Sequence, residues 1–494
     1  MITAKEMNAF GIPRDPVLMP LAMRLANTAL ARGADPGRMR EELALVCARP
    51  AALREHPVLG ELAAALEARL PDGGRFVPRA EPAPWISFGG PDIEAGAIAQ
   101  MEAASALPCA VRGALMPDAH AGYGLPIGGV LAVEGAVIPY AVGVDIACRM
   151  RLTVLDMPAG ALDDARRDAL RDALERETRF GLGACFEKGE RREHAVMDED
   201  WDVCSEAGVS RDKAWQQLGT SGGGNHFAEF GELHLARPAL LGGREVPAGV
   251  HLALLSHSGS RGSGEDVASF YSRRAMALRP DLPKEMRHLA WLDLESGLGR
   301  QYWACMELMG RYASASHELI HRHVLARLGA EALACVENHH NFAWMEEHGG
   351  KRLVVHRKGA TPAGPGVQGI VPGSMASPGF VVQGLGCEDA LASCSHGAGR
   401  RMSRAEAFRT LSREKLAKLL AERRVELVSG SLDESPEAYK DIAGVMAGQA
   451  RLVDILARFE PRLVKMAPER KIRAAGRKRK VGKAGKAGQA GPCE

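Results

Sequence analysis

Aromatic side chains make up only 5% of the 494 residues, and none of the ten cysteines belongs to a CxxC pair. Cysteines scattered in this way are typical of a protein that stays in a reducing compartment. The first ten residues, MITAKEMNAF, lack the apolar segment that a signal peptide requires. We therefore expect a cytoplasmic protein.

The sequence also lacks a long uninterrupted hydrophobic run. No charged residue occurs from Gly359 to Cys387, but glycine, proline and serine interrupt this segment too often for a membrane-spanning helix. We therefore expect no membrane partner. The 56 glycines instead predict many tight turns, and several glycine clusters coincide with histidines.

Charge is nearly balanced over the whole chain, with a formal net charge of +2. Residues 470–494 contain nine Lys and Arg residues and one Glu, so they carry +8 and the preceding 469 residues carry −6. A generally basic surface is thereby excluded. A polyanionic partner must be bound by a local patch or by the tail.

Composition divides the chain into four segments. Leucines at helical spacing predict a small helical appendage over residues 1–72, and the Pro-rich stretch 73–84 predicts a linker. Patterns of strands and helices alternate over residues 85–466. The low-complexity basic tail, residues 467–494, is expected to be disordered.

The segment PYAVGVDIACRM places Asp145 and Cys148 at the end of an apolar run that predicts a buried strand. A carboxylate and a thiolate are costly to keep ionised inside a protein unless a cation neutralises them. Together with imidazoles, they suit zinc, manganese, iron or cobalt. An isolated pair of this kind is more often a turn cap and a small buried hydrophobic residue. The metal hypothesis therefore depends on histidines elsewhere.

Histidines next to unusual segments supply such partners. In LGTSGGGNHFAEF three glycines precede Asn225 and His226, which favours a phosphate-binding loop beside a metal ligand over a core histidine. His257 follows a predicted strand in SHSGSRG. His339 and His340 are adjacent in ENHHNFAW, so in an extended segment only one of them can face a given site.

His396 lies in the glycine-rich turn SCSHGAGR, ahead of a helix that begins at a capping box. A histidine in such a turn is suited to attack phosphorus, because neighbouring amides and guanidinium groups can stabilise the developing charge. A further metal ligand and a plain turn residue are the alternatives. Asp118 and His120, in MPDAHAGYGLPIGGV, either belong to a functional site or form a turn.

Residues 317–321 read HELIH, which matches the HExxH motif of zinc proteases. So short a pattern arises easily by chance in a helix. We therefore expect these residues to lie on a solvated helix face and not to bind zinc.

Taken together, the motifs of residues 85–466 resemble those of the RtcB family of RNA ligases. The resemblance rests on MPDAHAGYGLPIGGV, GVDIAC, GGGNHF, SHSGSRG, HHN, RKGA, PGSM, SHGAGR and EAYKDI. It implies an α/β (mixed α+β) fold of packed β-sheets surrounded by helices. It also implies a GTP- and Mn²⁺-dependent ligase that joins RNA 3′-phosphate or 2′,3′-cyclic phosphate ends to 5′-hydroxyl ends, in tRNA splicing or RNA repair. An archease-like activator is a further expected partner.

Residue by residue, the resemblance implies that Cys148 bridges two manganese ions. His257 and His340 then complete one metal site, and Asp145 and His226 complete the other. A shared thiolate is a suitable bridge because its charge offsets both cations.

The resemblance also makes His396 the residue that takes GMP from GTP and passes it to the RNA 3′-phosphate, forming RNA-(3′)pp(5′)G. The implied nucleotide contacts are Asn225, Phe227, Glu229, Ser374, Ala398, Gly399 and Lys465. The chain departs from the family at Gly379, where a second serine is common, and after Lys465, which 29 residues follow although the family usually ends there. These departures, the helical appendage and the tail indicate a divergent branch.

Two other classes of protein use similar residues. A dinuclear metal-dependent phosphoesterase or nuclease would activate water with the Asp, Cys and His cluster, but it has no need of His396. An RNA-binding protein with a structural metal would retain the ion without joining RNA. His396 is therefore the residue that separates these hypotheses.

Overall fold

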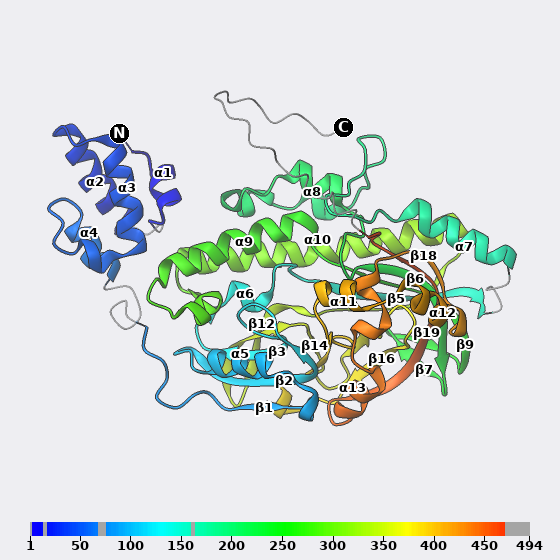
Figure 1. Cartoon of the computed structure of the whole chain (residues 1–494). Helices are drawn as coiled ribbons and strands as arrows, with labels where there is room; N and C mark the ends of the chain where they lie inside the picture. Colours follow the sequence, from blue (N-terminus) through cyan, green and yellow to red (C-terminus); the bar gives the residue numbers. More distant parts are fainter. Residues whose placement is uncertain (1, 13–16, 68–75, 160–163, 470–494) are drawn as a thin grey trace.

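Two β-sheets lie at the centre of the protein, and helices surround them (Figure 1). This computed structural model describes residues 2–12, 17–67, 76–159 and 164–469. The helices are α1 (Ala4–Phe10), α2 (Leu18–Ala31), α3 (Pro36–Ala48), α4 (Gly60–Glu67), α5 (Ala95–Ser105), α6 (Pro139–Val142), α7 (Asp164–Glu177), α8 (Arg211–Gln217), α9 (Arg261–Leu278), α10 (Gly297–Leu328), α11 (Arg404–Thr410), α12 (Arg413–Glu422) and α13 (Ile442–Gly448). The strands are β1 (Trp85–Ser87), β2 (Ala110–His120), β3 (Ile127–Val133), β4 (Ala136–Val137), β5 (Arg149–Pro158), β6 (Phe227–Leu235), β7 (Ala239–Leu241), β8 (Arg244–Val246), β9 (Gly249–Ser258), β10 (Leu292–Asp293), β11 (Ala332–His339), β12 (Asn341–His348), β13 (Lys351–Lys358), β14 (Ala360–Pro362), β15 (Gln368–Val371), β16 (Gly379–Gly384), β17 (Ser393–Ser395), β18 (Glu426–Ser429) and β19 (Val453–Met466). The expected mixed α/β fold is confirmed.

The larger sheet has eight strands in the order β11-β5-β9-β6-β19-β16-β15, with β18 paired to β19. Neighbours in this order run antiparallel, and only β18 lies parallel to its partner. The smaller sheet has the order β1-β2-β3-β13-β12. His340 separates β11 from β12, so the chain passes from the larger sheet to the smaller one at this residue.

The N-terminal helices α1 to α4 pack around a hydrophobic core of their own. Thr3 and Glu6 form a capping box at the start of α1. These helices lie near one end of α9, where the Arg274 guanidinium donates hydrogen bonds to backbone carbonyls of α1 (Figure 1). These helices agree with the predicted helical character, and residues 1, 13–16 and 68–72 of the predicted appendage lie outside the described part. The division into domains stays a prediction.

The helix expected after the His396 turn is also confirmed. Helix α11 begins after Ser403, whose side chain accepts a hydrogen bond from the Glu406 amide, as the capping box predicts.

The prediction of a strand leading directly to Asp145 and Cys148 is wrong. The chain forms β3 and β4, but Pro139 then begins the short helix α6. Proline suits this first helical position because its fixed φ is helical and it has no amide hydrogen to satisfy. Gly143, with a φ of 102°, follows the helix. Asp145 and Cys148 therefore lie in a loop between α6 and β5.

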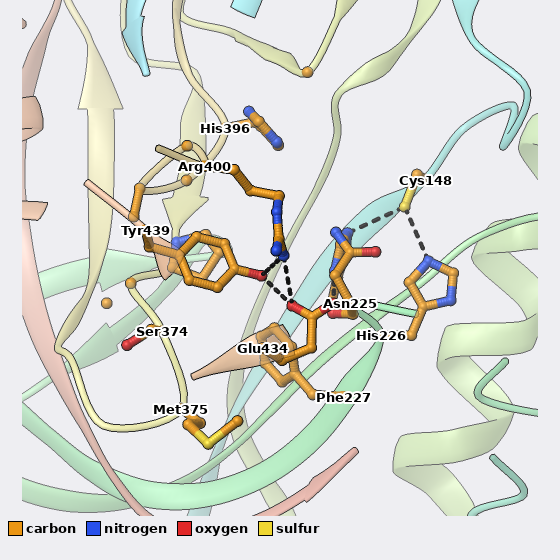
Figure 2. A pocket seen from close by; sticks show the side chains of 18 of the residues that line it. Cys148, Asn225, His226, Phe227, Ser374, Met375, His396, Arg400, Glu434 and Tyr439 are labelled. Carbon is orange, nitrogen blue, oxygen red and sulfur yellow. Dashed lines mark hydrogen bonds and ion pairs between the residues drawn. The ribbon is translucent and has the colours of Figure 1, made fainter. Parts of the chain in front are cut away.

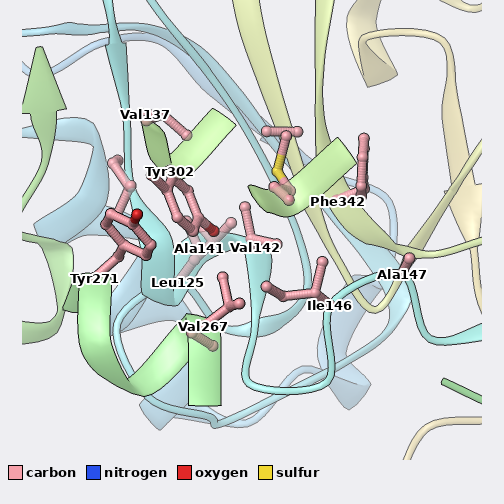
Figure 3. Close-up of a cluster of buried hydrophobic side chains, with 14 of the residues drawn as sticks. Leu125, Val137, Ala141, Val142, Ile146, Ala147, Val267, Tyr271, Tyr302 and Phe342 are labelled. Carbon is pink, nitrogen blue, oxygen red and sulfur yellow. The ribbon is translucent and has the colours of Figure 1, made fainter. Parts of the chain in front are cut away.

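Buried side chains fix this loop in place (Figure 3). Ile146 and Ala147 are fully buried and belong to the core cluster that α6, α9 and α10 share, with Val267 and Tyr302 among its members. Burial of one isoleucine side chain stabilises a fold by about 1.5–3 kcal/mol. The loop is thus anchored by the apolar residues that separate Asp145 from Cys148.

The longest helix, α10, has 32 residues and lies against α9 and the larger sheet (Figure 1). Buried side chains recur at intervals of three or four along it, and none of its Arg and Glu residues belongs to this buried set. Across the described ranges, no helix is both long enough and apolar enough to cross a bilayer.

An ion pair inside the smaller sheet provides a test of the packing. Arg357 on β13 is 1% exposed, and its two terminal nitrogens lie 2.6 and 2.9 Å from the Glu346 carboxylate on β12. Arg357 also donates to the Ser393 hydroxyl and the Leu391 carbonyl, so its removal deletes several buried hydrogen bonds to a charged group, each worth about 1.5–3 kcal/mol. We expect Arg357→Met to lower the Tm by several degrees in a calorimetric scan.

The matched control is Arg458→Met, which removes an exposed ion pair with Glu460 on β19. Its Tm should change little, because exposed pairs contribute about 0–1 kcal/mol. Equal shifts for the two variants would contradict the stabilising role of the buried pair.

Candidate active site

Four neighbouring strands of the larger sheet bring metal-binding side chains to one end of that sheet. In the antiparallel order β11-β5-β9-β6, the ends of β11 and β9 lie beside the beginnings of β5 and β6. His340 directly follows β11, and Cys148 directly precedes β5. His257 is the penultimate residue of β9, and His226 directly precedes β6. Strand pairing therefore gathers residues that are far apart in the sequence.

These side chains meet around the Cys148 sulfur. Its Sγ lies 3.1 Å from Nε2 of His257 and 3.4 Å from Nε2 of His226. Nε2 of His340 is 3.3 Å from Nε2 of His257, and Oδ2 of Asp145 is 3.1 Å from Nε2 of His226. The structure thus brings all five predicted metal ligands together, with His340 beside His257 and Asp145 beside His226.

Backbone hydrogen bonds hold the loop that carries Asp145. The side-chain amide of Asn341 donates to the Asp145 carbonyl over 3.2 Å, and the Asn341 carbonyl accepts from the Ala147 amide over 2.7 Å. The Ser260 amide donates to the Asp145 carboxylate over 3.0 Å. Ala147 has a φ of 56°, a strained value for a residue with a side chain, and these contacts keep it there.

The protonation states of this group suit a cation. Burial and the neighbouring His226 ring lower the pKa of His257 to about 3, and burial lowers the pKa of His340 well below its usual value. Both rings are therefore neutral, with lone pairs available to a metal. Burial and the nearby Asp145 raise the pKa of the Cys148 thiol well above its usual value. Its thiolate is stable only beside a cation, so the donor set fits metal ions.

His396 is held by a buried carboxylate from the smaller sheet. It follows β17, and its Nδ1 lies 2.7 Å from Oδ2 of Asp118 on β2. The same oxygen accepts hydrogen bonds from the backbone amides of His396 and Gly397. Because Nδ1–H donates to Asp118, Nε2 keeps its lone pair. The His396 ring lies 5.0 Å from the His340 ring, measured between centroids.

A cavity of about 380 Å³ contains both groups (Figure 2). The five metal-ligand candidates and His396 line it. So do six of the predicted nucleotide contacts: Asn225, Phe227, Glu229, Ser374, Ala398 and Gly399. Its size lies within the usual range for a small-molecule site. The cavity therefore joins a metal-ligand group, an oriented histidine and a pocket in one place.

A sequence profile described as tRNA-splicing ligase RtcB matches residues 100–214 and 190–466 of this chain. The chain belongs to the RtcB family. It is similar to the RNA-splicing ligase RtcB of Escherichia coli strain K12, with 32% identity over 408 residues, 74% of this chain and 93% of that protein. The enzyme of the same name from Mycobacterium tuberculosis strain H37Rv is 32% identical over 421 residues, 72% of this chain and 97% of its own length. The tRNA-splicing ligase RtcB of Thermococcus kodakarensis is 31% identical over 424 residues, which cover 70% and 86% of the two chains.

Lys465 is the one nucleotide contact expected from the RtcB resemblance that the structure does not bring to the cavity. It lies on β19 between Val464 and Met466, which both line the cavity. Because side chains alternate along a strand, Lys465 points to the opposite face. There its Nζ donates to the carbonyls of Leu174 and Glu175 at the end of α7. Gly379 lines the cavity without a side chain, as the sequence predicts.

Of the two adjacent histidines, only His340 joins the site, which confirms the prediction from their spacing. His339 points to the other side and stacks on Trp344, with ring centroids 5.0 Å apart. Its Nδ1 accepts a hydrogen bond from the Arg149 guanidinium over 3.0 Å. His339 is therefore a packing residue of the sheet.

The HELIH segment is buried and not solvated, contrary to expectation. His317 and His321 lie on the face of α10 that packs on the sheet, and both contact the Ser256 hydroxyl, at 3.1 and 2.9 Å. His321 also contacts the Thr153 hydroxyl at 2.7 Å. Hydroxyl groups bind both nitrogens of His321 and Nδ1 of His317, so the segment forms a polar contact between α10 and the sheet. Within this segment, only the Glu318 side chain is partly exposed, as expected for a solvated helix face.

A second group of cavity residues had no role assigned from the sequence. Glu434 is 1% exposed and contacts Arg400, Arg404 and the Tyr439 hydroxyl (Figure 2). Tyr439 belongs to the EAYKDI motif, which marked the position without indicating its partners. The sequence signal for Arg400 was its place after the His396 turn. This network fixes the turn from its far side.

The metal-ligand group also opens to a second groove. Asp145 and His226 line both this groove and the cavity. Lys213 and Arg261 project cationic groups into it, and Gln217 adds an amide. Asp145 and Glu265 add carboxylates to this lining, and Lys213 is paired with Asp266 over 2.8 Å, so cations and carboxylates occur there together.

The contact between Asp118 and His396 predicts which ring nitrogen of His396 carries the hydrogen. Asp118→Asn removes the carboxylate charge and gives the three donors either a weaker neutral oxygen or an NH₂ group that cannot accept. We expect the Nδ1–H tautomer of His396 in the wild type and a mixture of tautomers in the variant. Selective ¹⁵N-histidine NMR measures this directly. An unchanged Nδ1–H spectrum in Asp118→Asn would show that Asp118 does not set the tautomer.

Proposed function

We propose that this protein is a GTP- and Mn²⁺-dependent RNA ligase that joins RNA 3′-phosphate or 2′,3′-cyclic phosphate ends to 5′-hydroxyl ends, in tRNA splicing or RNA repair. The observation that carries this proposal is the position of His396. Its Nδ1 is bound to Asp118, its Nε2 remains available, and its ring lies beside the metal-ligand group. A hydrolase that activates water does not require such a side chain. Similarity to RNA-splicing ligases supports the same function.

We assign two manganese ions to the ligand group, with Cys148 between them. His257 and His340 then belong to one ion, and Asp145 and His226 to the other. Mixed sulfur, nitrogen and oxygen ligands are compatible with this metal. Bound ions of this kind neutralise phosphate charge and act as Lewis acids. The chain contributes fixed ligands, because the buried loop and the strand ends that carry them are already in place.

The role of His396 follows from its free nitrogen. Nε2 attacks the α-phosphorus of GTP, a P–N bond forms, the bond to the β-phosphate oxygen breaks and pyrophosphate leaves. The GMP passes from Nε2 to an oxygen of the RNA 3′-phosphate, which gives RNA-(3′)pp(5′)G. The 5′-hydroxyl oxygen then attacks the 3′-phosphorus and displaces GMP. Throughout, Asp118 keeps the ring oriented and stabilises the positive charge that it gains.

The nucleotide occupies the part of the cavity lined by Asn225, Phe227, Glu229, Ser374, Ala398 and Gly399. Phe227 and Glu229 point to the same face of β6, beside Met466 and Val464 of β19. Burial raises the pKa of Glu229 well above its usual value. A base that hydrogen-bonds to this carboxyl would satisfy it. Lys465 takes no part in this arrangement, because its Nζ is engaged on the other face of β19.

The second groove offers two cationic side chains to an RNA backbone. Lys213 and Arg261 can contact phosphates there, and the groove ends at Asp145 and His226. A strand bound in this groove would bring its end to the ligand group from the side opposite His396. We assign this groove to the strand that carries the 5′-hydroxyl.

Covalent capture of GMP is the decisive test. Incubation with α-³²P-GTP and Mn²⁺ should label the wild-type protein through an acid-labile bond, because a phosphoramidate hydrolyses in acid. His396→Gln should lose at least 99% of the label. His323→Gln, on the partly exposed face of α10, is the control and should label normally. Label on the His396→Gln protein at the wild-type level would exclude His396 as the nucleophile.

Metal binding tests the ligand group separately. Changes to groups that merely orient a ligand weaken metal binding about 10- to 100-fold, so loss of the central thiolate should weaken it at least as much. Titration calorimetry with Mn²⁺ should show this for Cys148→Ala. His321→Gln, which changes the HELIH segment, should bind Mn²⁺ as the wild type does. Equal affinity of wild type and Cys148→Ala would refute the assignment.

A further inference from the structure

Tyr123 is the most exposed large hydrophobic side chain in the described part of the chain, at 69%. Single exposed hydrophobic residues are common and need no explanation by themselves. This one is unusual because the protein has few aromatic residues, and Phe408, also in the described part, is exposed to only 41%. The residues around Tyr123 therefore decide whether its exposed ring has a functional role.

The backbone around Tyr123 is fixed from the inside of the protein. The Gln100 side chain bonds both polar groups of Gly122, accepting from its amide over 2.9 Å and donating to its carbonyl over 2.5 Å. The Tyr123 carbonyl accepts a hydrogen bond from Nζ of Lys358, a buried lysine. Gly124 has a φ of +71°, and a side chain there would collide with the His288 carbonyl. An exposed ring on so rigid a loop loses little entropy when it binds a ligand.

Neighbouring rings and charges define the surroundings of Tyr123. His288 contacts it edge to face, with centroids 5.6 Å apart, and also contacts Tyr140 at 4.6 Å. Partial burial and the positive charges of Lys358 and Arg287 lower the pKa of His288. Arg287 is exposed. The ring is thus accessible and lies in a locally positive environment.

The loop that carries Tyr123 lies at the His396 side of the cavity. It connects β2 to β3, and the residues at its two ends, His120 and Ile127, line the cavity. Lys358, which holds the Tyr123 carbonyl, is followed by Gly359, where a Cβ would lie 3.0 Å from Cε1 of His396. The second groove, in contrast, meets the cavity at Asp145 and His226.

We propose that Tyr123 is a stacking platform for the terminal nucleotide of the RNA strand that carries the 3′-phosphate. The inference rests on the proposed ligase function, in which this strand receives GMP from His396 and its end must reach that side of the cavity. Proteins bind single-stranded RNA by stacking bases on aromatic rings next to cationic groups. A rigid, exposed tyrosine that contacts His288, the residue after the exposed Arg287, offers both features.

The experiment compares wild type, Tyr123→Phe and Tyr123→Ala in ligation of two separate strands under saturating GTP and Mn²⁺. Loss of one stacked base should raise the KM for the 3′-phosphate strand about 5- to 150-fold in Tyr123→Ala. The KM for the 5′-hydroxyl strand and the GMP label on His396 should stay at their wild-type values. Tyr123→Phe should behave as the wild type does, because it keeps the ring. Leu240→Ala, which removes an equally open apolar side chain from the β7–β8 hairpin, is the control.

A second measurement reports stacking itself. A 3′-phosphate strand with 2-aminopurine as its last base should lose fluorescence on binding to the wild type and to Tyr123→Phe, but not to Tyr123→Ala. An unchanged KM for this strand in Tyr123→Ala overturns the proposal and leaves the ring as a contact for a protein partner. A raised KM for the 5′-hydroxyl strand alone overturns the assignment of the strand. Absence of GMP label in the wild type refutes the proposed function itself, independently of Tyr123.

Discussion

The antiparallel pairing of β11, β5, β9 and β6 is the constraint on which the site depends. It places two strand ends and two strand beginnings side by side, so that His340, Cys148, His257 and His226 reach one another across nearly 200 residues of sequence. A shift of register by one residue would turn His257 to the other face of β9. The hydrophobic core on both sides of the sheet opposes such a shift. Packing of ordinary apolar residues thus sets the geometry of the ligands.

The smaller sheet supplies the other half of the chemistry. Asp118 lies on β2, and His396 follows β17, so the oriented histidine does not depend on the strands that hold the metal ligands. The two halves meet at His340, where the chain passes between the sheets. This arrangement separates a histidine with an available nitrogen from the group of candidate metal ligands. The cavity between them is accessible from two sides, which is what the joining of two strands requires.

Burial determines the chemical state of most polar groups near the site. It keeps the rings of His257 and His340 neutral, and it makes the Cys148 thiolate unstable without a cation. Two other buried groups near the site have several partners each. His321 binds two hydroxyls, and Glu434 binds two guanidinium groups and a phenol. Satisfied networks of this kind give a rigid frame to the few groups left available.

The sequence by itself indicated candidate residues, because glycine next to histidine or aspartate is rarely explained by packing alone. The motifs led to Asp145, Cys148, His226, His257 and His396, and the resemblance to the RtcB family added His340 and six residues of the cavity lining. For the adjacent residues His339 and His340, period-two alternation predicts that the two side chains point to opposite sides. It does not predict which of them faces the site.

The tertiary structure alone decided matters that depend on long-range pairing. Lys465 fails to reach the cavity because β19 pairs with β6 in a register that turns Val464 and Met466 inward. HELIH is buried because α10 packs on Ser256, a neighbour that no local pattern reveals. Asp118 orients His396 from 278 positions away. Local sequence specifies residue type and periodicity, whereas the partner of a side chain is set by the fold of the whole chain.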